Sequence, residues 1–284
     1  MLLRCPRNLP STARNVLCAV ALTASLGAAK AVDAPCGKVL ILVSNVRDMG
    51  DPDRHDARNN LWEVAPPFHV FLMHGFDVDF VSPRGGPVEF MMDPVGISMY
   101  AIRYQGFLER TARTLAPEQV DPGRYRAVYV GGGYGPMFDV TPNRALQRIV
   151  AAIYEAGGVV GGSGHGPAAW ADVKLSDGSP MVRGKRVAGF PDSTERTKPW
   201  AKEGSLLPFL VEQRLRDNGA IALNKETLPD KESVVVDARL VSTMFLPSAA
   251  LVAKEMVTLM TSTSTACAPG GRAPGSSGAS PRSR

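Results

Sequence analysis

A glycine-rich stretch of the chain, residues 157–167, has the sequence GGVVGGSGHGP. It has the pattern of a short strand that ends in a sharp turn and continues into a helix. In enzymes this geometry commonly holds a nucleophilic side chain at the tip of the turn, close to backbone N–H groups that stabilise an oxyanion. Here the tip is Gly164, which has no side chain, and His165 follows it. The stretch therefore predicts a reactive site without its nucleophile.

Two further segments carry residue types that could do chemistry. Glu63 lies near the start of an otherwise apolar helical pattern, where an acid often serves only as a capping or dipole partner. The run GGGYGPMFD, residues 131–139, follows a buried strand, and its glycines free backbone N–H groups at a strand-to-helix turn. We expect a site for an anion or oxyanion at this turn. The expected ligand-binding residues are Gly132, Gly133, Tyr134 and Gly164.

The elements that would position these residues alternate along the chain. Continuous runs rich in β-branched residues predict strands that are covered on both faces, and amphipathic patterns between them predict helices. The predicted strands are residues 38–45, 77–83, 125–130, 158–164, 185–190, 233–238 and 240–244. The predicted helices are residues 61–75, 97–112, 143–156, 202–217 and 247–260.

This alternation, without an internal repeat, predicts an α/β fold with a doubly wound, mostly parallel sheet sandwiched by helices. Such sheets bind ligands at the carboxyl ends of their strands. The site is therefore expected after Ser44, Val130 and Gly162, which is where the unusual segments fall.

The two ends of the chain differ from this core in composition. Residues 1–31 contain four basic residues and no acid, enclose the apolar run VLCAVALTASLGAA and end in a small-x-small pattern. They predict a signal peptide, so that the protein is exported to the periplasm or secreted. A membrane anchor or a misassigned start is the alternative, but the apolar run is shorter than the roughly 20 residues a spanning helix needs. Residues 261–284 are predicted to be a disordered tail, which leaves residues 32–260 as the domain.

Charge and cysteine content narrow the possible partners. Of the formal net charge of +5, residues 1–31 contribute four and residues 261–284 three, so the core is slightly acidic. Charge therefore gives no support for a nucleic-acid partner. After removal of the signal peptide, Cys36 and Cys267 remain, and they are either a disulfide or two unpaired thiols.

The core resembles the DJ-1/PfpI superfamily, related to class I glutamine amidotransferases, and looks most like its glyoxalase III branch of heat-shock chaperone-like proteins. The resemblance runs from about residue 39 to residue 260 and rests on several motifs in order. These are Glu63 with Pro67, GFDVDFVSPRGG, GGYGPMFD, GGVVGGSGHGPAAW, GKRVAGFPDSTE and DARLVS. It implies a flavodoxin-like fold, and the family tends to form homodimers.

The resemblance also implies roles for single residues. The family pattern at the turn is Cys-His-Gly-Pro, so Gly164 stands at the position of the catalytic cysteine. By the same pattern Glu63 would contact the thiol and Glu195 would orient His165. Tyr134 stands where the family usually has histidine. In the glyoxalase branch the thiolate adds to the aldehyde of methylglyoxal on the way to D-lactate, a step that Gly164 does not permit.

Two functions from different classes remain open. One is a degenerate site that binds a small carbonyl or carboxylate compound, or a chaperone-like holdase that binds unfolded protein clients through its apolar surface. The other is an active lyase or hydrolase that uses Glu63, His165 and a water molecule. No cofactor is expected. No metal site is expected either, because the i, i+5 histidine pair His69 and His74 does not share a helix face well.

Overall fold

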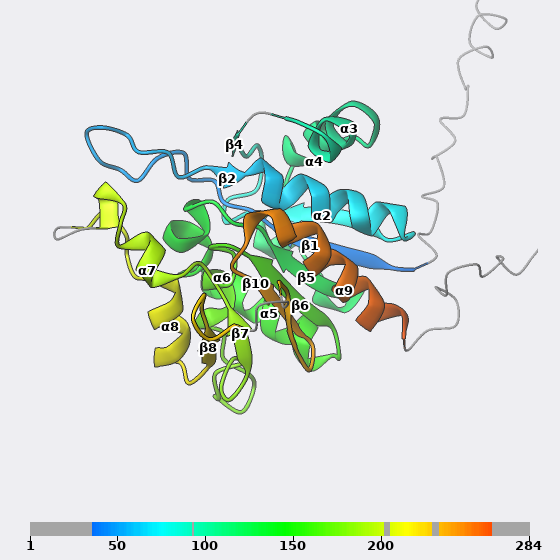
Figure 1. The fold of residues 1–284 in the computed structure, drawn as a ribbon. Helices are drawn as coiled ribbons and strands as arrows, with labels where there is room; N and C mark the ends of the chain where they lie inside the picture. The colour runs from blue at the N-terminus through cyan, green and yellow to red at the C-terminus, as the bar shows by residue number, and fades with distance from the viewer. Residues whose placement is uncertain (1–35, 93, 202–204, 229–232, 263–284) are drawn as a thin grey trace, which may run out of the picture. The chain divides into compact units, whose positions relative to one another are not determined.

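The computed structural model describes residues 36–92, 94–201, 205–228 and 233–262. Their centre is a six-stranded sheet with the strand order β3-β1-β5-β6-β10-β9 (Figure 1). All neighbours are parallel except β9, which is antiparallel to β10. The strands are β1 Lys38–Leu42, β3 Asp77–Val81, β5 Tyr125–Val130, β6 Val159–Ser163, β9 Val235–Asp237 and β10 Leu240–Thr243. The predicted doubly wound, mostly parallel sheet is confirmed.

Helices cover both faces of this sheet, as parallel strands require. On one face α2 (Leu61–Met73) packs against α9 (Ala249–Thr261), and both lie across the front of the sheet in Figure 1. On the other face lie α5 (Arg144–Glu155) and α6 (Ala168–Ala171). Side chains of β1 alternate between the two hydrophobic cores: Val39 and Ile41 join the first, Leu40 and Leu42 the second.

Short elements connect the main strands and helices. Two small parallel pairs join β2 (Asn59–Asn60) to β4 (Phe90–Met91) and β7 (Arg186–Ala188) to β8 (Ile221–Leu223). The predicted strand 185–190 therefore lies in its own two-stranded sheet. The helical turns are α7 Asp192–Glu195, η1 Pro117–Gln119, η2 Pro122–Arg124, the π-helix η3 Pro136–Val140, η4 Pro199–Ala201 and η5 Leu246–Ser248.

Two predicted helices differ from the structure. Residues 97–112 form two helices, α3 (Ile97–Tyr104) and α4 (Phe107–Thr111), because Gly106 adopts φ 68°, which ends the first helix before the second begins. The helix predicted over 202–217 begins only at Val211, as α8 (Val211–Asp217). Leu210 before it is extended, and Pro208 disfavours helix in the residue that precedes it.

The chain ends are only partly described. The predicted signal peptide and most of the predicted tail lie outside the described residues. Within the described ranges, no helix is long and apolar enough to cross a membrane. Cys36 is disulfide-bonded, so the alternative of an unpaired thiol is wrong for this residue. Cys267 lies outside the described residues, and its pairing with Cys36 stays a prediction.

Candidate functional site

Hydrogen bonds fix both backbone groups of Gly164, the residue at the tip of the turn after β6. Gly164 adopts φ 53°, a left-handed conformation that costs an L-residue roughly 1–2 kcal/mol. Its N–H donates to the carbonyl oxygen of Thr243 (3.0 Å), at the end of β10, and its carbonyl accepts from the N–H of Phe190 (2.7 Å). Two neighbouring segments therefore fix the turn, and glycine satisfies its backbone conformation without strain.

Glu63 reaches this turn from the first turn of α2. The helix begins after Asn60, whose side-chain oxygen accepts the N–H of Trp62 and so caps the helix. The Glu63 side chain is buried, with 3% of the residue exposed. A Cβ atom added to either Gly132 or Gly164 would collide with its carboxyl oxygens. The missing side chains of these two glycines thus provide the space in which the carboxyl group lies.

The carboxyl group of Glu63 is incompletely bonded. It shares hydrogen bonds with the side chain of Ser163 and the backbone of Gly132, but Oε1 is buried without a hydrogen-bond partner. Burial raises the pKa of Glu63 above its ordinary value of 4.5, and the opposing effects of His165 and the two hydrogen bonds are smaller. Burial thus shifts the equilibrium toward the neutral carboxylic acid relative to an exposed glutamate, and the neutral form can donate a hydrogen bond to a ligand oxygen.

The buried hydroxyl groups of Tyr129 and Ser163 lie next to Glu63. The Tyr129 hydroxyl donates to the backbone carbonyl of Glu63 (2.7 Å) and lies 2.8 Å from Ser163 Oγ. Both side chains are fully buried. Ser163 thus contacts Glu63 and Tyr129 beneath the turn.

His165 and Glu195 form the second half of the site. His165 Nε2 lies 2.7 Å from Glu195 Oε2, and both residues are buried. Glu195 Oε1 accepts two further hydrogen bonds, from the Tyr134 hydroxyl (2.9 Å) and from Trp200 Nε1 (3.3 Å). Burial raises the pKa of Glu195, but the hydrogen bonds from these three neighbours outweigh it, and the pKa lies below 4.5. Glu195 is therefore an ionised acceptor, which places a proton on Nε2 of His165.

Aromatic rings hold the imidazole of His165 in place. Phe190 stacks on it with a centroid distance of 4.3 Å and an interplanar angle of 18°. Tyr134 lies on it at 4.3 Å and 43°. The orientation of His165 is thus fixed by packing as well as by Glu195.

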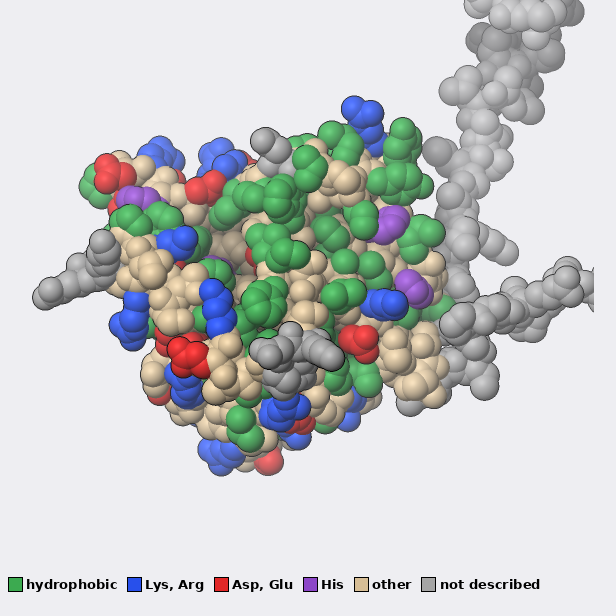
Figure 2. Space-filling view, in the orientation of Figure 1, with side chains coloured by type: hydrophobic (Ala, Val, Ile, Leu, Met, Phe, Trp, Pro, Cys, Tyr) green, Lys and Arg blue, Asp and Glu red, His purple; other side chains and the backbone are tan. Residues whose placement is uncertain are grey.

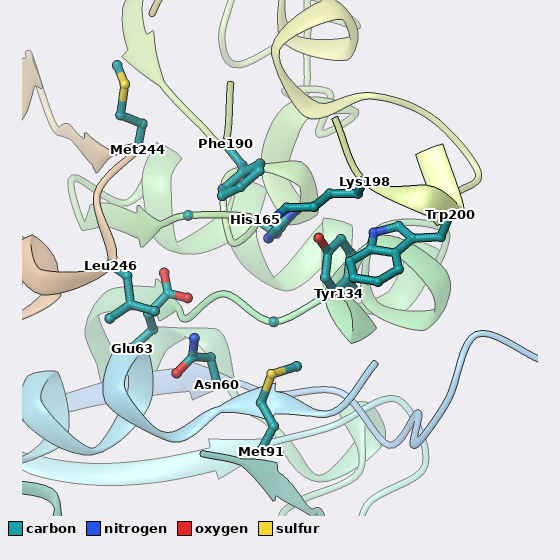
Figure 3. Close-up of a pocket in the computed structure, with 12 residues that line it drawn as sticks. Asn60, Glu63, Met91, Tyr134, His165, Phe190, Lys198, Trp200, Met244 and Leu246 are labelled. Atoms are coloured by element: carbon teal, nitrogen blue, oxygen red, sulfur yellow. The ribbon is translucent and has the colours of Figure 1, made fainter. Parts of the chain in front are cut away.

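These groups surround a cavity of about 280 Å³. Figure 3 shows Lys198 extending toward His165, with Glu63 and Asn60 on the other side of the cavity. The side chain of Lys198 has no ion pair or hydrogen bond with any residue that the structure describes, and no other Lys or Arg within that part of the chain lines the cavity. The lining residues are Asn60, Glu63, Met91, Gly133, Tyr134, Gly164, His165, Phe190, Lys198, Trp200, Met244 and Leu246. The cavity therefore has few polar groups on largely apolar walls, as small-molecule sites commonly do.

The structure brings most of the predicted site residues together. Glu63, Gly133, Tyr134, Gly164 and His165 line the cavity. Two do not: Glu195 lies behind His165, and Gly132 packs against the carboxyl group of Glu63.

Several lining residues were not predicted from the sequence. Phe190 precedes the proline of the FPDSTE motif, which could have pointed to it. Asn60, Lys198 and Trp200 carried no signal, because only the packing of their loops brings them to the cavity.

One loop near the site has residues that could hold a metal ion. Within the described ranges, Asp51, Asp53 and His55 are the one such group, with ligand atoms within 4.8 Å of one another. Asp51 accepts hydrogen bonds from the backbone of both residues, and Asp51 Oδ2 lies 2.7 Å from His55 Nδ1. These bonds account for the loop geometry, so we assign no metal to it.

Comparisons with known proteins agree with one another. No family model matches the chain. The chain is 30% identical over 169 residues to the glutathione-independent glyoxalase HSP31 of Saccharomyces cerevisiae, an alignment that covers 56% of this chain and 70% of that protein. The crystal structure of glyoxalase III from Candida albicans superimposes with a TM-score of 0.69 at 23% identity, covering 79% of this chain and 97% of that one. A ThiJ/PfpI domain protein from Brachyspira murdochii gives a TM-score of 0.55 at 16% identity, covering 80% and 98%.

Proposed function

This chain belongs to the DJ-1/PfpI superfamily, together with the glutathione-independent glyoxalases, and from that membership we propose that it binds small carbonyl or carboxylate compounds without covalent catalysis. The observation that carries the proposal is the position of Glu63. Its Oε1 atom lies at clashing distance from the position that a Cβ atom on Gly164 would take. A carboxyl group, and no thiol, thus lies at the position that the family resemblance assigns to the nucleophile's surroundings.

No other described side chain replaces the missing thiol. The one cysteine in the described ranges, Cys36, is disulfide-bonded and precedes β1, at the end of the sheet opposite the site. Ser163 is fully buried and hydrogen-bonded beneath the turn. Without a thiolate, addition to an aldehyde to form a hemithioacetal has no nucleophile.

The polar groups that remain suit an oxygen-rich ligand. The raised pKa of Glu63 favours its neutral form, which can donate to a carbonyl or carboxylate oxygen. Asn60 uses its side-chain oxygen to cap α2, which leaves its amide N–H groups free to donate. Lys198 supplies a positive charge that no described acid neutralises. The three donors together favour a compound that carries a carboxylate, such as a 2-oxo or 2-hydroxy acid.

A second candidate function is an active lyase or hydrolase. It is favoured by one observation: an acid with a raised pKa, Glu63, and an oriented histidine, His165, face the same cavity. These two groups could move protons to and from a ligand through a bound water molecule. General acid–base catalysis of this kind contributes about 10²–10⁴-fold in rate.

The test measures binding and turnover on the same preparations. Calorimetric titration with pyruvate, D-lactate and methylglyoxal reports binding, and formation of D-lactate from methylglyoxal reports turnover. We expect the unmodified protein to bind the carboxylates and to form no D-lactate. We expect Gly164→Cys to gain turnover, with Gly164→Ala as the matched control for the backbone strain at this position.

Two results would change the proposal. D-lactate formation by the unmodified protein, lost in Glu63→Gln and His165→Gln, would establish the second candidate. Absence of binding for every compound would contradict both candidates.

We further propose that the protein works outside the cytosol. Cys36 is disulfide-bonded, and structural disulfides persist in oxidising compartments such as the periplasm. Fractionation of cells with an antibody to the native chain tests this. Recovery of the protein in the cytosolic fraction with its thiols reduced would contradict it.

A further inference from the structure

A second cavity, of about 340 Å³, lies beside the one that holds Glu63 and His165. Its lining is apolar except for one serine, and it contains no ionisable side chain. We call it the apolar groove. The lining residues are Trp62, Pro66, Val95, Ile97, Ser98, Leu246, Pro247 and Ala250.

The two cavities share their walls. The N-cap residue Asn60 and Glu63 of α2 line the site, whereas Trp62 and Pro66 of α2 line the groove. Leu246 lines both cavities. This leucine is half-buried at the start of η5 and is the residue that the linings of the polar site and the groove share.

The groove opens onto an exposed apolar surface. Val95 and Ile97 are 55% and 45% exposed, although both are hydrophobic. Figure 2 shows hydrophobic side chains gathered on this face over α2, α3 and α9. Exposed apolar surface next to a polar pocket is typical of a site whose ligand has both a polar and an apolar part.

We propose that the ligand of this protein is amphipathic: a 2-oxo or 2-hydroxy carboxylate with an unbranched aliphatic chain. The inference rests on the proposed function and names the substrate class of the same site. The carboxylate lies near Lys198 and the 2-oxygen near Glu63, while the chain passes Leu246 and lies in the apolar groove. A three-carbon compound would fill only the polar cavity and would leave the groove empty.

The chain length of the ligand tests the inference directly. Affinity is measured by calorimetry for pyruvate, 2-oxohexanoate, 2-oxooctanoate and 2-oxodecanoate. Each methylene buried in the groove is expected to tighten binding about threefold to fourfold. The gain should begin once the chain is long enough to pass Leu246.

A pair of charge substitutions separates the groove from the general surface. Ile97→Asp places a carboxylate in the groove, whereas Leu251→Asp places one on α9, at a residue that is 46% exposed and does not line the groove. Ile97→Asp is expected to abolish the gain with chain length and to leave pyruvate binding unchanged. Leu251→Asp is expected to change neither.

Three outcomes would overturn the inference. The first is an affinity that does not rise with chain length while pyruvate still binds, which leaves the proposed function standing. The second is that Ile97→Asp and Leu251→Asp change the gain in affinity with chain length by the same amount. The third is that light scattering shows a dimer that Ile97→Asp dissociates, since a second copy would then cover the groove. Failure of every 2-oxo acid to bind contradicts the proposed function itself.

Discussion

The carboxyl group of Glu63 lies in space that a side chain on Gly164 would need. Oε1 of Glu63 lies so close to Gly164 that even a single Cβ atom on the glycine would collide with it. Gly132 leaves room for the same carboxyl group on its other side. Oε1 has no hydrogen-bond partner within the described residues, so steric packing and not hydrogen bonding positions this oxygen.

Substitution of Gly164 by alanine should destabilise the fold. The left-handed backbone and the collision with Glu63 together are expected to lower the free energy of unfolding by about 1–3 kcal/mol. Chemical denaturation measures the change. Gly106→Ala is the control, since Gly106 is also left-handed, at φ 68°, but its nearest non-neighbouring atom is 3.7 Å from an added Cβ. An equal loss in both variants would show that the collision contributes nothing.

The raised pKa of Glu63 should appear in the pH dependence of stability. The folded state holds the proton more tightly than the unfolded state, so the stabilisation is complete below pH 4.5 and is lost as the pH rises toward the folded pKa. The slope in this window is at most about 1.4 kcal/mol per pH unit. Glu63→Gln should flatten the profile there. A wild-type profile that already lacks this slope would contradict the raised pKa of Glu63.

Glu195 should have the opposite effect. Its folded pKa is lowered, so its contribution is present above pH 4.5 and is lost as the pH falls through the folded pKa. Glu195→Gln is expected to lower the free energy of unfolding at neutral pH by about 1.5–3 kcal/mol, because it removes a charged acceptor from three donors. Glu118→Gln, at an exposed acid, serves as the control. Equal stability of the two variants would show that the hydrogen bonds of Glu195 add nothing to the free energy of unfolding.

Lys198 should discriminate charged from uncharged ligands. Lys198→Gln is expected to weaken pyruvate binding about tenfold, which corresponds to about 1.4 kcal/mol, and to leave methylglyoxal binding unchanged. Lys198→Arg should retain most of the affinity, and Lys174→Gln, at an exposed lysine, should change nothing. Titration calorimetry at two salt concentrations provides the comparison. A similar loss for both ligands would assign Lys198 a role in packing only.

Local sequence patterns were sufficient to predict most of the sheet and its main helices. Continuous apolar runs predicted β1, β5 and β6 because both faces of these strands are covered by helices. The patterns failed where tertiary contacts decide the outcome. Residues 185–190 look like another core strand, yet β7 pairs only with β8 in a separate sheet. Gly106 ended a helix that periodicity alone would continue.

The sequence predicted those site residues that belong to a recognisable motif. Glu63, His165 and Glu195 were named from the sequence, and the structure places Glu195 2.7 Å from His165. Asn60, Lys198 and Leu246 were missed. They come from three distant segments that carry no motif, and only the folded loops bring them to one cavity.

By itself, the sequence determined the α/β architecture, the turn at Gly164 and the types of residue near it, because hydrophobic periodicity and glycine content act locally along the chain. Only the tertiary structure decided where the carboxyl group of Glu63 lies and that Leu246 lines both the polar cavity and the apolar groove. Both depend on contacts between segments far apart in sequence, where a shift of about an ångström changes which atoms share a space.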